Sequence, residues 1–194
     1  KDLLDEAVRI ASEDVKSRLE ADGQPFDEQA ELVARTIGIG AVKYADLSLN
    51  RESNYRFSYA KMLALNGNTA PYMLYAYARI KGIERKAKDA LEGEGVDVAD
   101  AELVLEHETE IALAKQLLKL PEVLERLEQE LYPNQLCDYL FETSQKFNQF
   151  YENCPVIQAE TEEVRVSRTA LCTATSQLLS LSLGLLGIGV LDKI

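Results

Sequence analysis

Apolar positions recur at intervals of three and four residues along most of this 194-residue chain, a spacing that predicts amphipathic helices. The first expected helix covers residues 2–22 with Asp2 as its cap, and the second begins after Asp27. Gly38 and Gly40 fall inside the second helix, where each glycine costs roughly 1 kcal/mol of helix propensity. They therefore predict either a break in that helix or a close contact with a neighbouring element.

Between residues 48 and 60 the helical periodicity is lost. Tyr55, Phe57 and Tyr59 alternate with polar residues, which favours a short extended segment. Helical spacing then returns and predicts helices over residues 61–65, 71–91, 101–119, 121–131, 135–152 and 160–186, with a linker around Gly93 and Gly95. The predicted fold class is all-α, ending in an antiparallel helix bundle.

The segment after residue 65 predicts a helix that carries aromatic and basic side chains on one face. Asn66-Gly67 is a turn signal, and the run Asn68-Thr69-Ala70-Pro71 supplies a cap and a proline suited to the first turn. Tyr72 and Arg79 are seven residues apart, so they share a face, and Lys86 continues it. A ring beside a guanidinium suits stacking against an unpaired base. The alternative is that the tyrosines are packing residues and Arg79 is simply solvated.

The charge distribution is uneven. The net charge of −12 argues against indiscriminate nucleic-acid binding, since such proteins usually present positive surface. Residues 71–90 nevertheless hold five basic and two acidic side chains, whereas residues 91–110 hold eight acidic ones and no Lys or Arg. This contrast predicts a local basic strip on the 71–91 helix, with chance clustering on a solvated helix as the alternative.

Signals of catalysis are missing from the sequence. It contains no GxSxG motif, P-loop or GxGxxG motif, and its one histidine, His107, lies in an acidic run, as expected of a helix-surface residue. Cys137, Cys154 and Cys172 form no CxxC pair, which fits a reduced compartment and no structural zinc. We therefore expect no catalytic residue, no metal site and no membrane partner. The start without Met suggests a piece of a longer protein.

Several segments, in their order and spacing, resemble the C-terminal part of class I arginyl-tRNA synthetases (arginine–tRNA ligases). The resemblance covers essentially the whole chain. The segments that carry it are Asp2–Ala7, Gly38–Ser48, Asn68–Arg79, His107–Leu124, Tyr139–Tyr151, Arg168–Leu171 and Leu183–Ile188.

This resemblance implies an enzyme that attaches arginine to tRNA(Arg) with ATP and Mg²⁺. It implies that residues 1–65 are the helical end of a catalytic domain, following its Rossmann core, and that residues 66–194 are a DALR-type anticodon-binding bundle. The HIGH motif, the arginine pocket and the ATP site belong to family segments outside this chain, so this fragment alone is expected not to be catalytic. A cytoplasmic location is expected, with an organellar isoform left open.

Matched to the family's motifs, Tyr72, Arg79, Tyr151 and the C-terminal Ile194 fall near the anticodon loop, and Lys86 extends the basic row. The family usually ends in Met, from which Ile194 departs. Two other hypotheses stay open. One is a non-enzymatic helical module that binds protein through the 71–91 helix. The other is a scaffold without a ligand, which predicts no exposed aromatic side chain on that helix.

Overall fold

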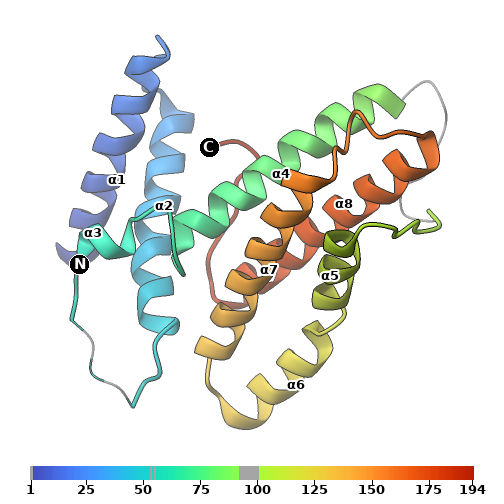
Figure 1. The fold of residues 1–194 in the computed structure, drawn as a ribbon. Coiled ribbons are helices and arrows are strands. Elements are labelled where there is room, and N and C mark those ends of the chain that lie inside the picture. The colour runs from blue at the N-terminus through green and yellow to red at the C-terminus, as the bar shows by residue number, and fades with distance from the viewer. Residues whose placement is uncertain (1, 53, 55, 92–100) are drawn as a thin grey trace.

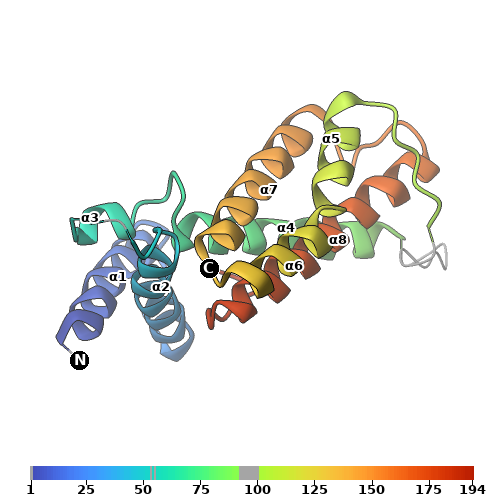
Figure 2. The same ribbon diagram turned by 90° about the horizontal axis from the view of Figure 1, so that it is seen from below.

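The computed structural model describes residues 2–52, 54, 56–91 and 101–194, and their regular structure is entirely helical (Figures 1 and 2). The prediction of an all-α fold is confirmed. The helices are α1 (Asp2–Ala21), α2 (Glu28–Leu47), α3 (Tyr59–Met62), α4 (Ala70–Leu91), α5 (Glu108–Leu117), α6 (Leu120–Glu130), α7 (Asn134–Asn153) and α8 (Glu162–Leu185). Within those ranges we find no helix with the length and hydrophobicity needed to cross a bilayer.

Helices α1 and α2 form an antiparallel pair at one end of the molecule (Figure 1). Asp27 caps α2, because its side chain accepts a hydrogen bond from the Ala30 N–H at 2.9 Å. Gly38 lies where α1 approaches most closely: a Cβ at this position would stand 2.7 Å from the Val8 Cα. Helix α2 continues through Gly38 and Gly40 without interruption. Of the two predicted explanations for these glycines, the close contact is right and the break is wrong.

Helix α4 connects this pair to a bundle formed with the last four helices (Figures 1 and 2). Helix α8 runs back along α4, and α7 packs against both. The core between them is made of fully buried side chains from all three helices: Met73, Leu74, Ile80, Leu140, Phe147, Phe150, Leu179 and Leu183. The remaining surface of α4 carries exposed basic residues, among them Arg79, Arg85 and Lys86. The helix is therefore amphipathic, as its sequence predicts.

The extended segment predicted within residues 48–60 does not become a strand in the part that the structure describes, although residues 56–58 are non-helical and Ser58 has an extended backbone. Tyr55 lies outside the described residues. Ser58 caps the short helix α3, and the Phe57 ring meets the Tyr59 ring edge-on at a centroid distance of 4.7 Å. An alternating pattern needs a partner strand to complete its hydrogen bonds, and these helices supply none.

The helix predicted over residues 101–119 is wrong in its first third, since α5 begins only at Glu108. The Ser167 side chain bonds both backbone groups of Val104, at 2.9 and 3.0 Å, and so holds this stretch in a non-helical conformation beside α8. His107 then caps α5 in a capping box with Glu110. The linker predicted around Gly93 and Gly95 lies outside the described residues.

Candidate nucleic-acid interface

Asn148 of α7 joins Tyr72 and Arg79 of α4 into one hydrogen-bonded row. The Asn148 Nδ2 donates to the Tyr72 hydroxyl at 2.7 Å, and the Arg79 Nη1 donates to the Asn148 Oδ1 at 3.2 Å. The row forms because a seven-residue spacing places Tyr72 and Arg79 on the same face of α4, beside α7. The structure confirms the predicted shared face and adds a third residue from a distant part of the chain.

One tyrosine ring belongs to this Tyr72–Asn148–Arg79 row, and a second, that of Tyr151, lies on the same face of α7 as Asn148. Tyr72 is partly buried, and its ring meets Phe141 edge-on at a centroid distance of 5.7 Å. Tyr151, three residues after Asn148 and so on the same face of α7, is 40% exposed. Its ring lies nearly parallel to the buried Phe147, at 12° and 6.1 Å between centroids. A ring supported on one side by the core can offer its other face to a base with little loss of side-chain entropy.

The predicted basic strip of α4 offers fewer free cations than its charge count suggests. Lys81 pairs with Glu84 one turn later, and the Arg85 guanidinium is bonded to the C-terminal tail. Among the α4 side chains that the structure describes, Arg79 and Lys86 remain as exposed cations on the face of the row. Part of the strip therefore stabilises the fold, and part of it is available to a ligand.

The C-terminal tail is attached to another side of α4. Tyr77 donates to the Asp192 Oδ1 at 3.1 Å, and the Arg85 Nη1 donates to the Asp192 carbonyl at 3.1 Å. Burial, with this hydrogen bond to Asp192, raises the pKa of Tyr77 to about 12. Ile194 is partly buried against the core. Tyr77 is five residues after Tyr72, so it and the tail bonded to it lie on a different face of α4 from the row. The predicted contact of Ile194 with the anticodon stays a prediction.

Comparison with known proteins gives this geometry a family. The profile described as DALR anticodon binding domain matches residues 73–194, which is more than half of the chain. The chain belongs to the DALR anticodon-binding domain family. A second profile, described as tRNA synthetases class I (R), catalytic domain, matches residues 1–59.

The curated relatives are similar over the full length of this chain. They include the arginine–tRNA ligase of Nostoc punctiforme, 56% identical, and that of Crocosphaera subtropica, 54% identical; the match spans all of this chain and 32% of each relative. Solved structures of arginyl-tRNA synthetases are also similar to this chain. The arginyl-tRNA synthetase of Thermus thermophilus is 28% identical with a TM-score of 0.86, and that of Plasmodium falciparum is 31% identical with a TM-score of 0.83. Both cover all of this chain, which corresponds to 32% and 33% of their own lengths.

The role of Asn148 in the DALR domain was not predicted from the sequence. Two signals were available: its place within the Tyr139–Tyr151 segment, and its position three residues before Tyr151, which puts both on one face of α7. Nothing in the spacing indicates that this face meets α4. Tyr75 lies next to the predicted face of α4 but contacts α1 instead. Its hydroxyl accepts a hydrogen bond from the Arg18 Nη1 at 2.7 Å, and the Arg18 guanidinium lies 5.3 Å from its ring centroid.

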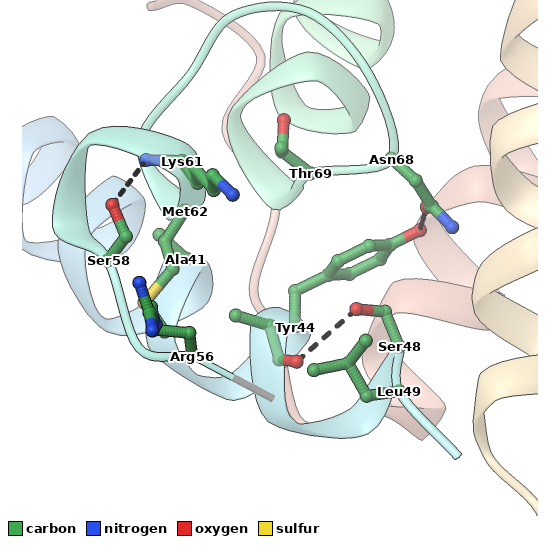
Figure 3. Close-up of a pocket in the computed structure, with 11 residues that line it drawn as sticks. Ala41, Tyr44, Ser48, Leu49, Arg56, Ser58, Lys61, Met62, Asn68 and Thr69 are labelled. Atoms are coloured by element: carbon green, nitrogen blue, oxygen red, sulfur yellow. Dashed lines mark hydrogen bonds between the residues drawn. The ribbon is translucent and has the colours of Figure 1, made fainter. Parts of the chain in front are cut away.

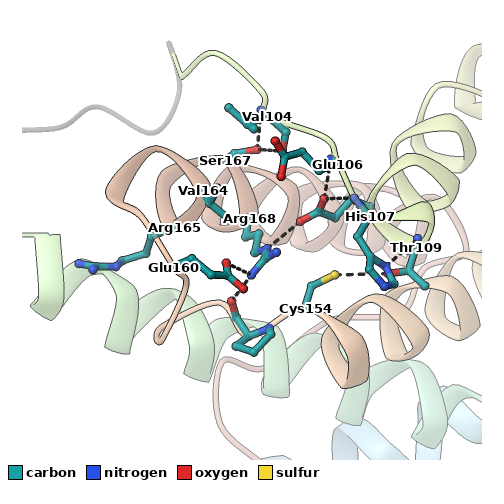
Figure 4. Close-up of polar contacts among 12 residues, drawn as sticks. Val104, Glu106, His107, Thr109, Cys154, Glu160, Val164, Arg165, Ser167 and Arg168 are labelled. Atoms are coloured by element: carbon teal, nitrogen blue, oxygen red, sulfur yellow. Dashed lines mark hydrogen bonds and ion pairs between the residues drawn. The ribbon is translucent and has the colours of Figure 1, made fainter.

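A second polar cluster in the DALR domain is centred on the buried side chains of Arg168 and Glu110 (Figure 4). The Arg168 Nε donates to the Glu110 Oε1 at 2.7 Å, and its Nη1 donates to the Pro155 carbonyl at 2.9 Å and to the Glu160 Oε2 at 3.3 Å. Burial alone would raise the pKa of Glu110, but hydrogen bonds from Arg168 and from the backbone of His107 and Glu106 lower it overall. We call this the Arg168–Glu110 cluster; it fixes α5 and the preceding loop onto α8.

The predictions about metal and thiol chemistry concern His107 and the three cysteines. The His107 Nδ1 accepts from the Thr109 N–H at 3.2 Å, so this histidine is a helix cap, partly buried, rather than a free surface residue. Cys137, Cys154 and Cys172 are free and buried. Burial raises the pKa of the Cys137 thiol to about 12, which disfavours the reactive thiolate.

Proposed function

We propose that this chain is the C-terminal, tRNA-binding part of an arginine–tRNA ligase, which attaches arginine to tRNA(Arg). The support is the 56% identity to a relative with that name and the DALR profile over residues 73–194. The chain spans about a third of the length of the curated relatives it matches. The two profiles support a division into a connector, residues 1–65, and an anticodon-binding bundle, residues 66–194.

The observation that carries the proposal is the Tyr72–Asn148–Arg79 row with Tyr151 beside it. A base extruded from an RNA loop can stack on the exposed face of Tyr151, while Arg79 has donors left for a base edge or a phosphate. Lys86 extends the positive charge along the same face. Stacking contributes about 1–3 kcal/mol per base and so supplies affinity despite the net charge of −12. The choice between anticodons then falls to hydrogen bonds from Arg79 to a base edge.

ATP, Mg²⁺ and arginine belong to the proposed activity of the longer protein. In the described part of this chain, no three His, Cys, Asp or Glu side chains gather in a way that could hold a metal ion. As the family resemblance implies, we assign these ligands to the part of the relatives that lies outside the matched region. To this chain we assign the recognition of tRNA, in the cytoplasm or an organelle.

The decisive experiment compares two RNAs. Fluorescence anisotropy at one fixed, moderate salt concentration would give the Kd of this chain for tRNA(Arg) and for the same tRNA with its central anticodon base replaced. We expect tighter binding to the unaltered tRNA. We also expect Arg79→Gln to reduce the difference, whereas the matched variant Arg126→Gln, on the exposed face of α6, leaves it unchanged.

Equal binding to both tRNAs would contradict anticodon recognition by this chain. If a random acidic polymer competes as well as tRNA does, the protein-interaction module becomes the better explanation. The scaffold hypothesis predicted no exposed aromatic side chain on α4. Tyr72 and Tyr75 are partly buried and Tyr77 is buried, so this prediction of the scaffold hypothesis is met. The binding experiment separates the two hypotheses, since a scaffold would bind neither tRNA.

A further inference from the structure

A pocket of about 300 Å³ opens where the first helices meet the start of α4 (Figure 3). Its volume is at the lower end of the range for ligand pockets, about 300–1,000 Å³. The buried Tyr44 and Met62 form part of its apolar floor, and Arg56, Ser58 and Lys61 stand on one wall. Figure 3 shows Lys61 extending from α3 toward Thr69 on the opposite wall.

The charge of this pocket contrasts with that of the chain. The protein has 33 acidic and 21 basic residues, but none of the described residues that line the pocket is Asp or Glu. In the part of the chain that the structure describes, Arg56 and Lys61 form no ion pair, whereas Arg9, Arg18 and Arg126 each have a carboxylate partner one turn away. Two unneutralised cations facing one small space favour an anionic ligand.

The other polar groups of the pocket are largely committed, which fixes its shape. The Asn68 side chain accepts a hydrogen bond from the Tyr44 hydroxyl at 2.7 Å and donates one to the Asp138 carboxylate at 3.0 Å. The Asp138 carboxylate is therefore bonded to Asn68. The Thr69 hydroxyl donates to the Ala64 carbonyl. The cations, together with the Ser58 hydroxyl proton, are therefore the donors left for a ligand. This donor set fits the oxygens of a phosphate group.

The position of the pocket indicates which kind of molecule carries the phosphate group. Thr69 lines the pocket, and its hydroxyl also accepts the Tyr72 N–H, at 3.3 Å. Tyr72 begins the Tyr72–Asn148–Arg79 row, and Arg79 lies ten positions after Thr69, or roughly 15 Å along the helix. The pocket therefore lies close enough to the row for one RNA strand to reach both.

We propose that this pocket binds a phosphodiester of the RNA backbone through Arg56 and Lys61. The inference rests on the proposed function, since it takes the ligand to be the same tRNA. The contact carries no sequence information and fixes the position of the RNA strand relative to the row. It should strengthen binding to every tRNA by the same factor.

The test separates this contact from anticodon reading. Arg56→Gln/Lys61→Gln removes both cations, and Lys16→Gln/Arg126→Gln removes the same charge from exposed positions on α1 and α6. The Kd for tRNA(Arg) and for the tRNA with the altered central base is measured between roughly 50 and 200 mM salt. We expect the magnitude of the slope of log K against log salt to fall by about 0.7–0.9 in the pocket variant, the value for one phosphate contact, with the ratio of the two Kd values unchanged.

A slope equal to that of the control variant would overturn the pocket inference alone. A wild-type chain that fails to distinguish the two tRNAs would overturn the proposed function, while a reduced slope in the pocket variant would still support the pocket. Arg56→Lys/Lys61→Arg keeps both charges and should restore the slope, and thermal unfolding confirms that each variant is folded. Inorganic phosphate is titrated separately as a free anion. If the wild type binds it, the pocket variant does not, and the tRNA slope is the same in both, the pocket binds a free anion and the RNA assignment is overturned.

Discussion

Arg168 and Arg79 both donate hydrogen bonds to side chains of other elements, yet their surroundings differ in two respects. Arg168 is 8% exposed and meets two carboxylates, Glu110 and Glu160. Arg79 is exposed and meets a neutral amide, that of Asn148. In the first case the positive charge is neutralised inside the protein. In the second it stays available, and the amide only fixes its position.

The comparison shows how to separate a structural arginine from one that can bind a ligand when both lie in motifs of the same family. Burial makes an unpaired charge costly, so a buried arginine must find carboxylates within the chain. An exposed arginine has no such requirement, and a neutral partner reduces the entropy lost when a ligand binds. We expect changes in the Arg168–Glu110 cluster to affect stability, and changes in the Tyr72–Asn148–Arg79 row to affect tRNA binding.

The largest expected effect is on stability. Glu110→Gln leaves the buried Arg168 without its nearest charge partner and should lower the free energy of unfolding by about 3 kcal/mol, near the lower end of the range for broken buried pairs. Urea unfolding followed by circular dichroism measures this. Glu122→Gln, which breaks the exposed pair with Arg126, is the matched control and should cost less than about 1 kcal/mol. Similar losses in both variants would contradict the distinction.

The pH dependence of the same pair sharpens this prediction. The pKa of Glu110 is lowered in the folded protein from its reference value of 4.5, so its stabilising contribution is present above that value and is lost as the pH falls through the folded-state pKa. The difference in unfolding free energy between the wild type and Glu110→Gln should therefore be constant from about pH 7 to about pH 5 and shrink below pH 4.5. A difference that persists undiminished below the folded-state pKa would show that the loss comes from packing rather than from charge.

An intermediate effect is expected in the row. Asn148→Leu removes the amide that positions Tyr72 and Arg79, and should weaken tRNA(Arg) binding about tenfold, or roughly 1.4 kcal/mol. Its cost in stability should stay at about 1 kcal/mol or below, because both partners reach water. Gln149→Leu adds the same apolar group at the exposed neighbouring position and serves as the control. A large loss of stability with unchanged tRNA binding would place Asn148 with the structural residues.

The smallest effect is expected at Lys86. This side chain is exposed, and we expect it to contact a phosphate rather than a base. Lys86→Gln should weaken binding about two- to threefold for the cognate and the altered tRNA alike, and reduce the salt slope by about 1. Lys16→Gln on α1 is the charge-matched control. A variant that loses discrimination between the two tRNAs would instead show that Lys86 reads a base.

The sequence by itself determined the fold class and most helix bounds, because helical periodicity and caps are local properties. Asp27, for example, caps α2 as predicted. It also placed Tyr72 and Arg79 on a common face, since seven residues make two helical turns. Its local errors have local causes: His107 starts α5 later than the apolar spacing suggests, and no strand pairs with the alternating segment around Phe57.

Only the tertiary structure decided which polar residues meet. Asn148 lies 76 positions after Tyr72, and Arg168 lies 58 positions after Glu110, so no spacing rule connects either pair. The same holds for Gly38, whose role became clear when α1 was found against it. Periodicity reports the face of a helix on which a residue lies. The packing of helices determines whether that face meets a carboxylate, an amide or water, and this choice separates the buried Arg168 from the exposed Arg79.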